Sequence, residues 1–221
     1  MKITLKDGSV KQYEGEMSVI DIAKDISEGL ARMACAGELN GKVVDLRTLV
    51  SEDAQLNILT FNDEAGKAAY RHTTSHVLAQ AVKRLYPEAK LAIGPSIDTG
   101  FYYDFDCPSF DRAALDRLEA EMKKIIKEGA ELERFTLPRA EAIKLMEERD
   151  EPYKVQLILD LPEDAQLSFY RQGDFVDLCA GPHLMSTKNI KAIKLISSSG
   201  AYWRGSEKNK MLTRIYGKAF T

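Results

Sequence analysis

The chain contains three histidines, and all of them lie in two short motifs that can carry acid–base or metal chemistry. His72 and His76 stand four residues apart in "RHTTSH", and His183 follows Cys179 at the same spacing in "DLCAGPHL". Imidazoles and a thiol can bind a borderline-soft metal or position a water molecule. Because all the histidine is concentrated there, we expect the two motifs to share one site; scattered surface histidines are the alternative.

The His-x-x-x-His spacing is a weak signal when it stands alone. The zinc-protease version places a glutamate directly after the first histidine as general base, whereas Thr73 occupies that position here. Thr73 therefore argues against a metalloprotease. The histidine pair becomes a stronger indication of a functional site when it is considered together with the second motif.

The element that must position the pair is a long helix, expected at about residues 68–85 and ended before Pro87. Residues four apart lie only about 40° apart around a helix, so His72 and His76 share a face. The apolar residues of this helix centre roughly 150° away from the pair; they are Leu78, Ala81, Val82 and Leu85. The histidines should therefore face a second layer or a cleft.

The remaining patterns predict two domains. Residues 1–61 show a hairpin around the Asp-Gly of "KDGS", a helix "SVIDIAKDI" with Ser18 as cap, an Asn-Gly turn and a closing strand "AQLNILTF". This order is typical of a β-grasp domain. Residues 62–221 predict an α+β domain with a mainly antiparallel sheet, including a helix that starts at Ser109 or Asp111 and ends at Gly129.

Composition excludes several classes of protein. The chain has 221 residues with 44% apolar and 29% charged residues, it has no membrane-span-length apolar run, and "MKITLKDGSV" is no signal peptide. Three widely spaced cysteines argue against a disulfide framework and for the cytoplasm. Residues 185–221 hold eight Lys/Arg and one acidic residue, which indicates either a local polyanion contact or simple solvation of edge strands.

The motifs together resemble the threonyl-tRNA synthetase family. "RHTTSH", "GFYYDF", "DLCAGPHL", "GAYWRG" and "RIYG" closely resemble the N-terminal region of the bacterial enzymes, a ubiquitin-like TGS domain followed by an editing domain. The resemblance spans nearly the whole chain, and the paired histidine motifs also resemble alanyl-tRNA synthetase editing domains. One departure is "RGS" at 204–206 where the family pattern has "RGD". The catalytic and anticodon-binding domains that follow in the family are absent, so the chain looks like a fragment.

The resemblance implies hydrolysis of mischarged seryl-tRNA(Thr), with the 3′ acceptor end of tRNA(Thr) as partner. Serine lacks one methyl of threonine, and a pocket can favour that methyl by only about 1–3 kcal/mol, so a second, smaller sieve is needed. The ATP-dependent ligation of threonine, the zinc that rejects valine, and homodimerisation belong to the full-length parent in this family.

The resemblance also implies roles for seven residues. His72 or Cys179 would position and activate water, and His76 and His183 would complete the polar wall. The others would act on substrate, with Lys154 near the ester oxygen, Asp177 at the ammonium group and Tyr103 at serine or the terminal adenosine.

The sequence leaves alternatives open for both the cofactor and the function. His72, His76, Cys179 and His183 could hold zinc, but "CAGPH" differs from the alanyl-type "CGGTH", and we expect no obligatory metal. A non-catalytic tRNA-binding module with structural histidines and a free-standing trans-editing hydrolase are the other interpretations.

Overall fold

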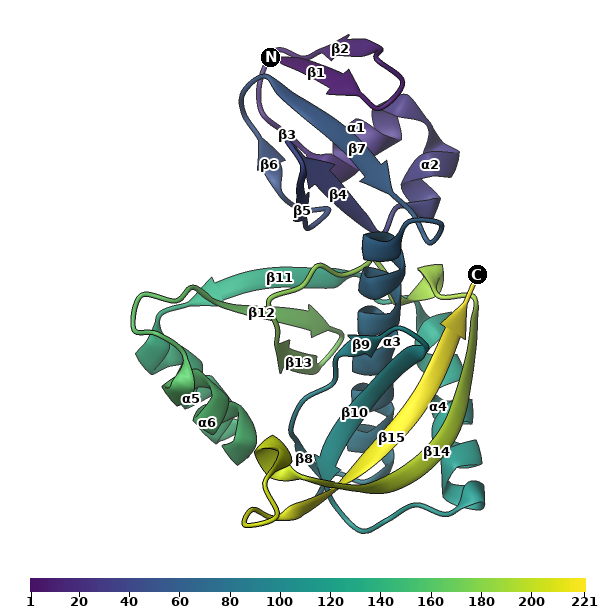
Figure 1. Cartoon of the computed structure of the whole chain (residues 1–221), viewed down its shortest axis with the longest axis vertical. Coiled ribbons are helices and arrows are strands. Elements are labelled where there is room, and N and C mark those ends of the chain that lie inside the picture. The colour runs from purple at the N-terminus through teal and green to yellow at the C-terminus, as the bar shows by residue number, and fades with distance from the viewer.

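The computed structural model describes all 221 residues, and its N-terminal unit stands on the tip of a long helix of the larger second unit (Figure 1). The elements of the N-terminal unit are β1 Lys2–Leu5, β2 Val10–Gln12, β3 Met17–Ser18, α1 Val19–Ile26, α2 Glu28–Met33, β4 Ala36–Leu39, β5 Lys42–Val44, β6 Leu49–Val50 and β7 Ala54–Leu59. They form a sheet of order β2-β1-β7-β4-β5, with β1 and β7 parallel and β3–β6 as a separate ladder.

Local signals account for most of this unit, and the predicted β-grasp arrangement agrees with it. Asn40 and Gly41 take positive φ angles of 51° and 83° in the turn between β4 and β5, as an Asn-Gly hairpin turn requires. Ser18 begins α1, where its hydroxyl accepts the backbone N–H of Asp21 at 3.2 Å. The short helix α2 was not predicted.

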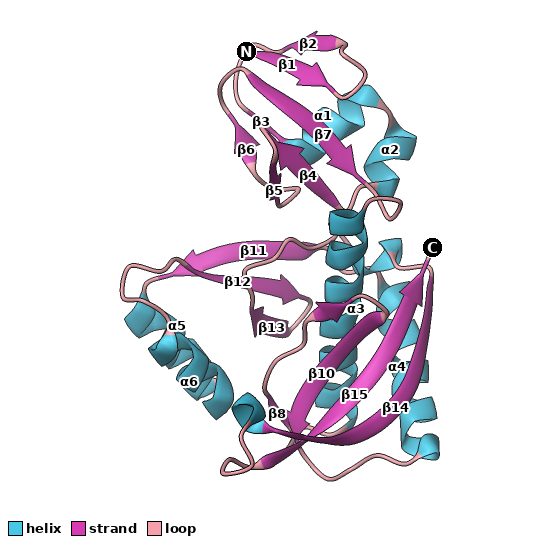
Figure 2. Cartoon of the chain, in the orientation of Figure 1, coloured by secondary structure: helices cyan, strands magenta, loops and turns pink.

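The second unit surrounds one long helix. Its elements are α3 Glu64–Leu85, β8 Lys90–Leu91, β9 Ser96–Ile97, β10 Gly100–Asp106, α4 Arg112–Glu128, β11 Leu132–Leu137, α5 Arg139–Glu148, α6 Pro152–Asp160, β12 Leu167–Gln172, β13 Phe175–Leu178, β14 Ala192–Tyr202 and β15 Met211–Phe220. Its sheets have the orders β14-β15-β10-β8 and β11-β12-β13, and every strand pairing in them is antiparallel, as predicted (Figure 2).

The helix α3 is more deeply buried than its sequence pattern suggests. Every residue from Thr73 to Val82 is buried, because α3 packs against β10, β15 and α4 and also contacts the β12–β13 hairpin. The expected second layer in front of the histidines is therefore present. The helix also starts at Glu64, four residues earlier than predicted, after Asp63 as N-terminal cap residue.

Two further differences concern the region that carries chemistry. The helix α6, which carries Lys154, was not predicted; with α5 it packs on the β11-β12-β13 sheet around a small core that includes Met146, Ile158 and Phe169. The segments "IKAIKLISSS" and "GAYWRG" together form one strand, β14, from Ala192 to Tyr202. No helix of the structure is both long and apolar enough to traverse a bilayer.

Candidate functional site

The two motifs meet where α3 faces the loop that follows β13. The Cys179 Sγ lies 3.5 Å from His72 Nε2 and 3.1 Å from His183 Nε2. The ring centroids of His76 and His183 are 4.4 Å apart, and those of His72 and His183 are 4.6 Å apart. Residues separated by more than a hundred positions thus form one cluster, the arrangement that the sequence predicts.

The path of the loop explains how Cys179 and His183 both point at α3. Gly181 has a φ of 74°, which favours glycine, and a Cβ there would lie 2.1 Å from the Tyr170 hydroxyl. Its backbone N–H donates to Cys179 Sγ at 3.3 Å. The close approach of Gly181 to Tyr170 lets the chain turn back within four residues.

Hydrogen bonds define the tautomer of His183. The single hydroxyl proton of Thr73 is directed at the Ala69 carbonyl, 2.8 Å away, as is common for threonine in helices. Thr73 Oγ1 must then accept from His183 Nδ1 at 2.9 Å, so Nδ1 carries the proton. His183 Nε2 is left as an acceptor facing Cys179 Sγ, and the thiol donates to it.

Burial keeps this cluster uncharged. It lowers the pKa of His76 to about 4 and that of His183 well below its usual value, against the attraction of Asp177 in the case of His76. Burial and then repulsion by His76 lower the pKa of His72 to about 3, although part of this side chain still faces the surface. Burial raises the pKa of Cys179 to about 12. Three neutral imidazoles and a neutral thiol are present at pH 7.

A buried ion pair lies beside the neutral cluster. Lys154 Nζ is 2.7 Å from Asp177 Oδ1, and the two side chains are 4% and 1% exposed. The Tyr103 hydroxyl donates to Asp177 Oδ2 at 2.7 Å, and His76 Nε2 lies 3.6 Å from the same oxygen. Burial alone would raise the pKa of Asp177, but Lys154, His76 and the hydrogen bonds hold it below its usual value.

A surface depression of about 410 Å³ opens onto these groups. Its lining includes five of the seven predicted residues: His72, His76, Lys154, Asp177 and Cys179. Tyr103 and His183 are fully buried and lie behind this lining. Gly94, Ser96 and Leu157 are among the other residues of its lining. The structure thus brings all seven residues together but exposes only part of them to a ligand.

The donor set also fits a metal ion. One ligand atom from each of His72, His76, Cys179 and His183 lies within 4.8 Å of the others. The proton on His183 Nδ1, bonded to Thr73, leaves Nε2 free, which is how metal-bound histidines are usually oriented. A metal would have to displace the thiol proton of Cys179, whose pKa burial raises. These four residues would hold zinc, which would supply a Lewis acid.

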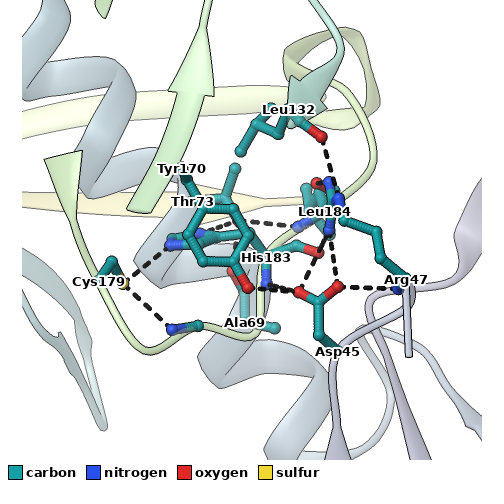
Figure 3. Close-up of polar contacts among 10 residues, drawn as sticks. Asp45, Arg47, Ala69, Thr73, Leu132, Tyr170, Cys179, His183 and Leu184 are labelled. Carbon is teal, nitrogen blue, oxygen red and sulfur yellow. Dashed lines mark hydrogen bonds and ion pairs between the residues drawn. The ribbon is translucent and has the colours of Figure 1, made fainter. Parts of the chain in front are cut away.

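Sequence reasoning missed four residues that orient the site (Figure 3). Thr73 bonds both the His183 ring and the Leu184 N–H; Asp45, Arg47 and Tyr170 surround the backbone and ring of His183. Thr73 adjoins His72 in "RHTTSH", which is the one signal that the sequence offers. Nothing in the sequence connects residues 45 and 47 with the loop that carries His183, more than a hundred positions away.

Two family models match the chain. The model of the TGS domain matches residues 1–60, and the model described as "Threonyl and Alanyl tRNA synthetase second additional domain" matches residues 167–216. The second match contains Asp177, Cys179 and His183.

Curated relatives match over the whole chain. The chain is 66% identical to the threonine–tRNA ligases of Acetivibrio thermocellus and Clostridium botulinum strain Eklund 17B, and it covers 35% and 34% of those proteins. It is 61% identical to that of Clostridium acetobutylicum, of which it covers 35%. The chain spans about a third of the length of these relatives, and all of this chain is aligned with each of the three.

Proposed function

The chain corresponds to the N-terminal part of bacterial threonyl-tRNA synthetases, with their TGS and editing domains, and from this premise we propose that it hydrolyses the aminoacyl ester of seryl-tRNA(Thr). The observation that carries the proposal is the cluster of His72, His76, Cys179 and His183, the first three of which line a depression of about 410 Å³. A synthetic site for threonine cannot reject serine strongly, since serine has the same amine and hydroxyl. A second site that accepts serine and excludes the extra methyl would correct the error.

His72 is the residue that we assign to activating water. It is neutral at pH 7, it lines the depression, and it is the histidine of the cluster that keeps surface exposure. Cys179 is less suited as a base or nucleophile, because burial keeps its proton on and that proton is directed at His183. Cys179 then orients the water, with its thiol in contact with the imidazoles of His72 and His183, and His76 and His183 complete the polar wall.

Lys154 and Asp177 supply charge to the ester. The Lys154 side chain lines the depression, and its ammonium group stabilises the developing oxyanion; such a donor in a dry site typically contributes about 10²–10³-fold in rate. Asp177 attracts the substrate's ammonium group and shares its charge with Lys154. Tyr103 does not line the depression; it orients Asp177 through its hydroxyl and so affects substrate binding indirectly.

We also propose the domain boundaries, the partner and the cellular compartment of the chain. Residues 1–61 form the TGS domain and residues 62–221 the editing domain, with the boundary in the turn before Asp63. The 3′ acceptor end of tRNA(Thr) is the partner, hydrolysis requires no metal, and three unpaired cysteines fit the cytoplasm. Ligation of threonine with ATP, the catalytic zinc and dimerisation are proposed for the full-length parent alone.

A deacylation series tests the assignment. Purified chain and its His72→Ala, Lys154→Met and Cys179→Ala variants are mixed with seryl-tRNA(Thr), with Cys107→Ala and the exposed Lys144→Met as matched controls. We expect slower hydrolysis in the three site variants, by about 10²–10⁴-fold for His72→Ala. Rates near that of the wild type in all three would reject the assignment. Binding of tRNA without hydrolysis by the wild type would favour the non-catalytic module.

A further inference from the structure

Two side chains of the N-terminal unit hold the backbone of the loop that carries His183 (Figure 3). Asp45 and Arg47 lie in the segment between β5 and β6. Asp45 Oδ2 accepts the His183 backbone N–H at 3.1 Å, and Arg47 Nη1 donates to the His183 carbonyl at 3.2 Å. Both backbone polar groups of a site residue are therefore satisfied by the other unit.

The guanidinium of Arg47 reaches further into the second unit. Its Nη2 donates to the Leu184 carbonyl at 2.7 Å, and its Nε donates to the Leu132 carbonyl at 2.9 Å. The planar fork of the guanidinium holds its donors in a fixed geometry that reaches three carbonyls from two segments at once. Because His183 is fully buried, water cannot replace these bonds while the loop keeps its position.

The Asp45 carboxylate also holds the Tyr170 ring beside the His183 imidazole. The Tyr170 hydroxyl donates to Asp45 Oδ2 at 2.6 Å, and the Tyr170 ring meets the His183 ring edge-on with centroids 4.3 Å apart. Arg47 Nη1 lies 3.0 Å from Asp45 Oδ1, and this ion pair orients the Asp45 carboxylate. Burial would raise the pKa of Asp45, but Arg47 and the Tyr170 hydroxyl hold it below its usual value, so the acceptor is a carboxylate at pH 7.

We propose that Asp45 and Arg47 are positioning residues for the editing site, through which the docked N-terminal unit sets the place of the His183 imidazole. The inference rests on the proposed hydrolysis. His183 Nε2 must stay 3.1 Å from Cys179 Sγ, and loss of either backbone anchor moves it. Neither Asp45 nor Arg47 lines the depression, so substrate binding does not depend on them.

Conservative variants of the full chain test this role. Asp45→Asn keeps the shape but loses the charge, and Arg47→Lys keeps the charge but loses the planar fork whose separate nitrogens reach the three carbonyls. Asp25→Asn is the matched control, since the Asp25 carboxylate also accepts a tyrosine hydroxyl, that of Tyr13 at 2.8 Å, but within the N-terminal unit. We expect kcat for seryl-tRNA hydrolysis to fall about 10- to 100-fold in Asp45→Asn and Arg47→Lys with KM unchanged. Asp25→Asn should leave both constants unchanged.

Nuclear magnetic resonance of ¹⁵N-labelled imidazoles provides a readout that is independent of activity. The His183 resonances should shift in Asp45→Asn and Arg47→Lys, as the Nδ1–H bond to Thr73 weakens, and should stay in place in Asp25→Asn. If the wild type does not hydrolyse seryl-tRNA, the proposed function fails while these shifts still decide the positioning role. Unmoved His183 resonances in both variants, or equal losses in Asp25→Asn, would overturn the inference.

Discussion

At the scale of single residues, burial keeps the imidazoles and the thiol of the site uncharged at neutral pH. His76 and His183 are buried imidazoles with lowered pKa values, and Cys179 is a buried thiol with a raised one. The buried charges that remain are paired, as Asp177 with Lys154. A neutral imidazole at the mouth can accept a proton from water, whereas a protonated thiol cannot attack an ester.

Cys179 should therefore be inert to alkylation in the folded chain. At pH 7.5 we expect iodoacetamide to modify it far more slowly than in the urea-unfolded chain, because only the thiolate reacts. Peptide mass spectrometry separates it from Cys35 and Cys107, whose pKa values are also raised by burial, to about 12 and about 11. Rapid alkylation of Cys179, or a seryl–enzyme adduct during turnover, would instead identify a nucleophilic thiolate.

The three histidines should also make stability fall as the pH drops. Their folded pKa values lie below the unfolded value of 6.5, so protons bind the unfolded chain first. The stabilisation is fully present above pH 6.5 and is lost as the pH falls toward about 4, by up to about 1.4 kcal/mol per pH unit for each fully buried histidine. Urea unfolding between about pH 7 and pH 5, where most carboxylates stay ionised, measures it. A free energy of unfolding that is constant over this window would contradict the neutral cluster.

At the scale of elements, the segment between β8 and β9 connects α3 with the ion pair. The Ser75 hydroxyl of α3 donates to the Gly94 carbonyl at 2.7 Å, and Gly94 lies against the ring of Tyr103, which bonds Asp177. The position of the ion pair therefore depends on a close approach of backbone to an aromatic ring.

Gly94→Ala should disrupt this contact. A Cβ at Gly94 would lie 2.0 Å from Tyr103 Cδ2, so the buried ring must move and the variant should lose about 1–3 kcal/mol of stability and much of its hydrolytic rate. Gly15→Ala is the matched control, because no atom lies within 4 Å of its added Cβ, and its stability should change by less than about 0.5 kcal/mol. Equal stability of the two variants in urea unfolding would show that the Tyr103 contact is not tight.

Local signals predicted the elements that have clear caps and turns. Asp111 begins α4 with its carboxylate on the Ala114 N–H, and Gly129 ends it in the left-handed region, both as the sequence indicates. The helices α2 and α6 were missed. Ser27 caps α2, but its six residues are too few to show a helical period, and α6 has Pro152 in its first turn but no side-chain cap.

Long-range contacts in the site were beyond sequence reasoning for a physical reason. Motif spacing placed the histidines and Cys179 in one site, because few residue types can do this chemistry. The bonds of Arg47 to Leu132 and of Asp45 to His183 join residues 85 and 138 positions apart, and an ordinary Asp and Arg in a turn give no sign of them. Such partners depend on how the two units dock.

At the scale of the whole molecule, the basic C-terminal segment is less available to a polyanion than its sequence suggests. Four of its eight basic residues form ion pairs with acids of the second unit; they are Lys194, Arg204, Lys210 and Arg214. The four without such a pair are Lys188, Lys191, Lys208 and Lys218. We still predict that this segment contacts tRNA phosphates, but only about half of its basic side chains are free of ion pairs within the chain.

The salt dependence of tRNA binding should reflect this smaller charge. With four phosphate contacts at most, the slope of log K against log salt should be about −3, compared with about −6 for eight. Fluorescence anisotropy of labelled tRNA between about 50 and about 200 mM salt measures the slope. An affinity that does not change with salt would contradict the predicted contact.

Proofreading by this site is tested most directly by comparing two esters on the same tRNA. Wild-type chain is mixed in single turnover with seryl-tRNA(Thr) and, separately, with threonyl-tRNA(Thr), and the released amino acid is followed over time. We expect seryl-tRNA to be hydrolysed at least about 100-fold faster, because a pocket built for serine has no room for the additional methyl. Equal rates for the two esters, or no hydrolysis of either above the rate in buffer, would contradict the claim that His72, His76, Cys179 and His183 form a proofreading site.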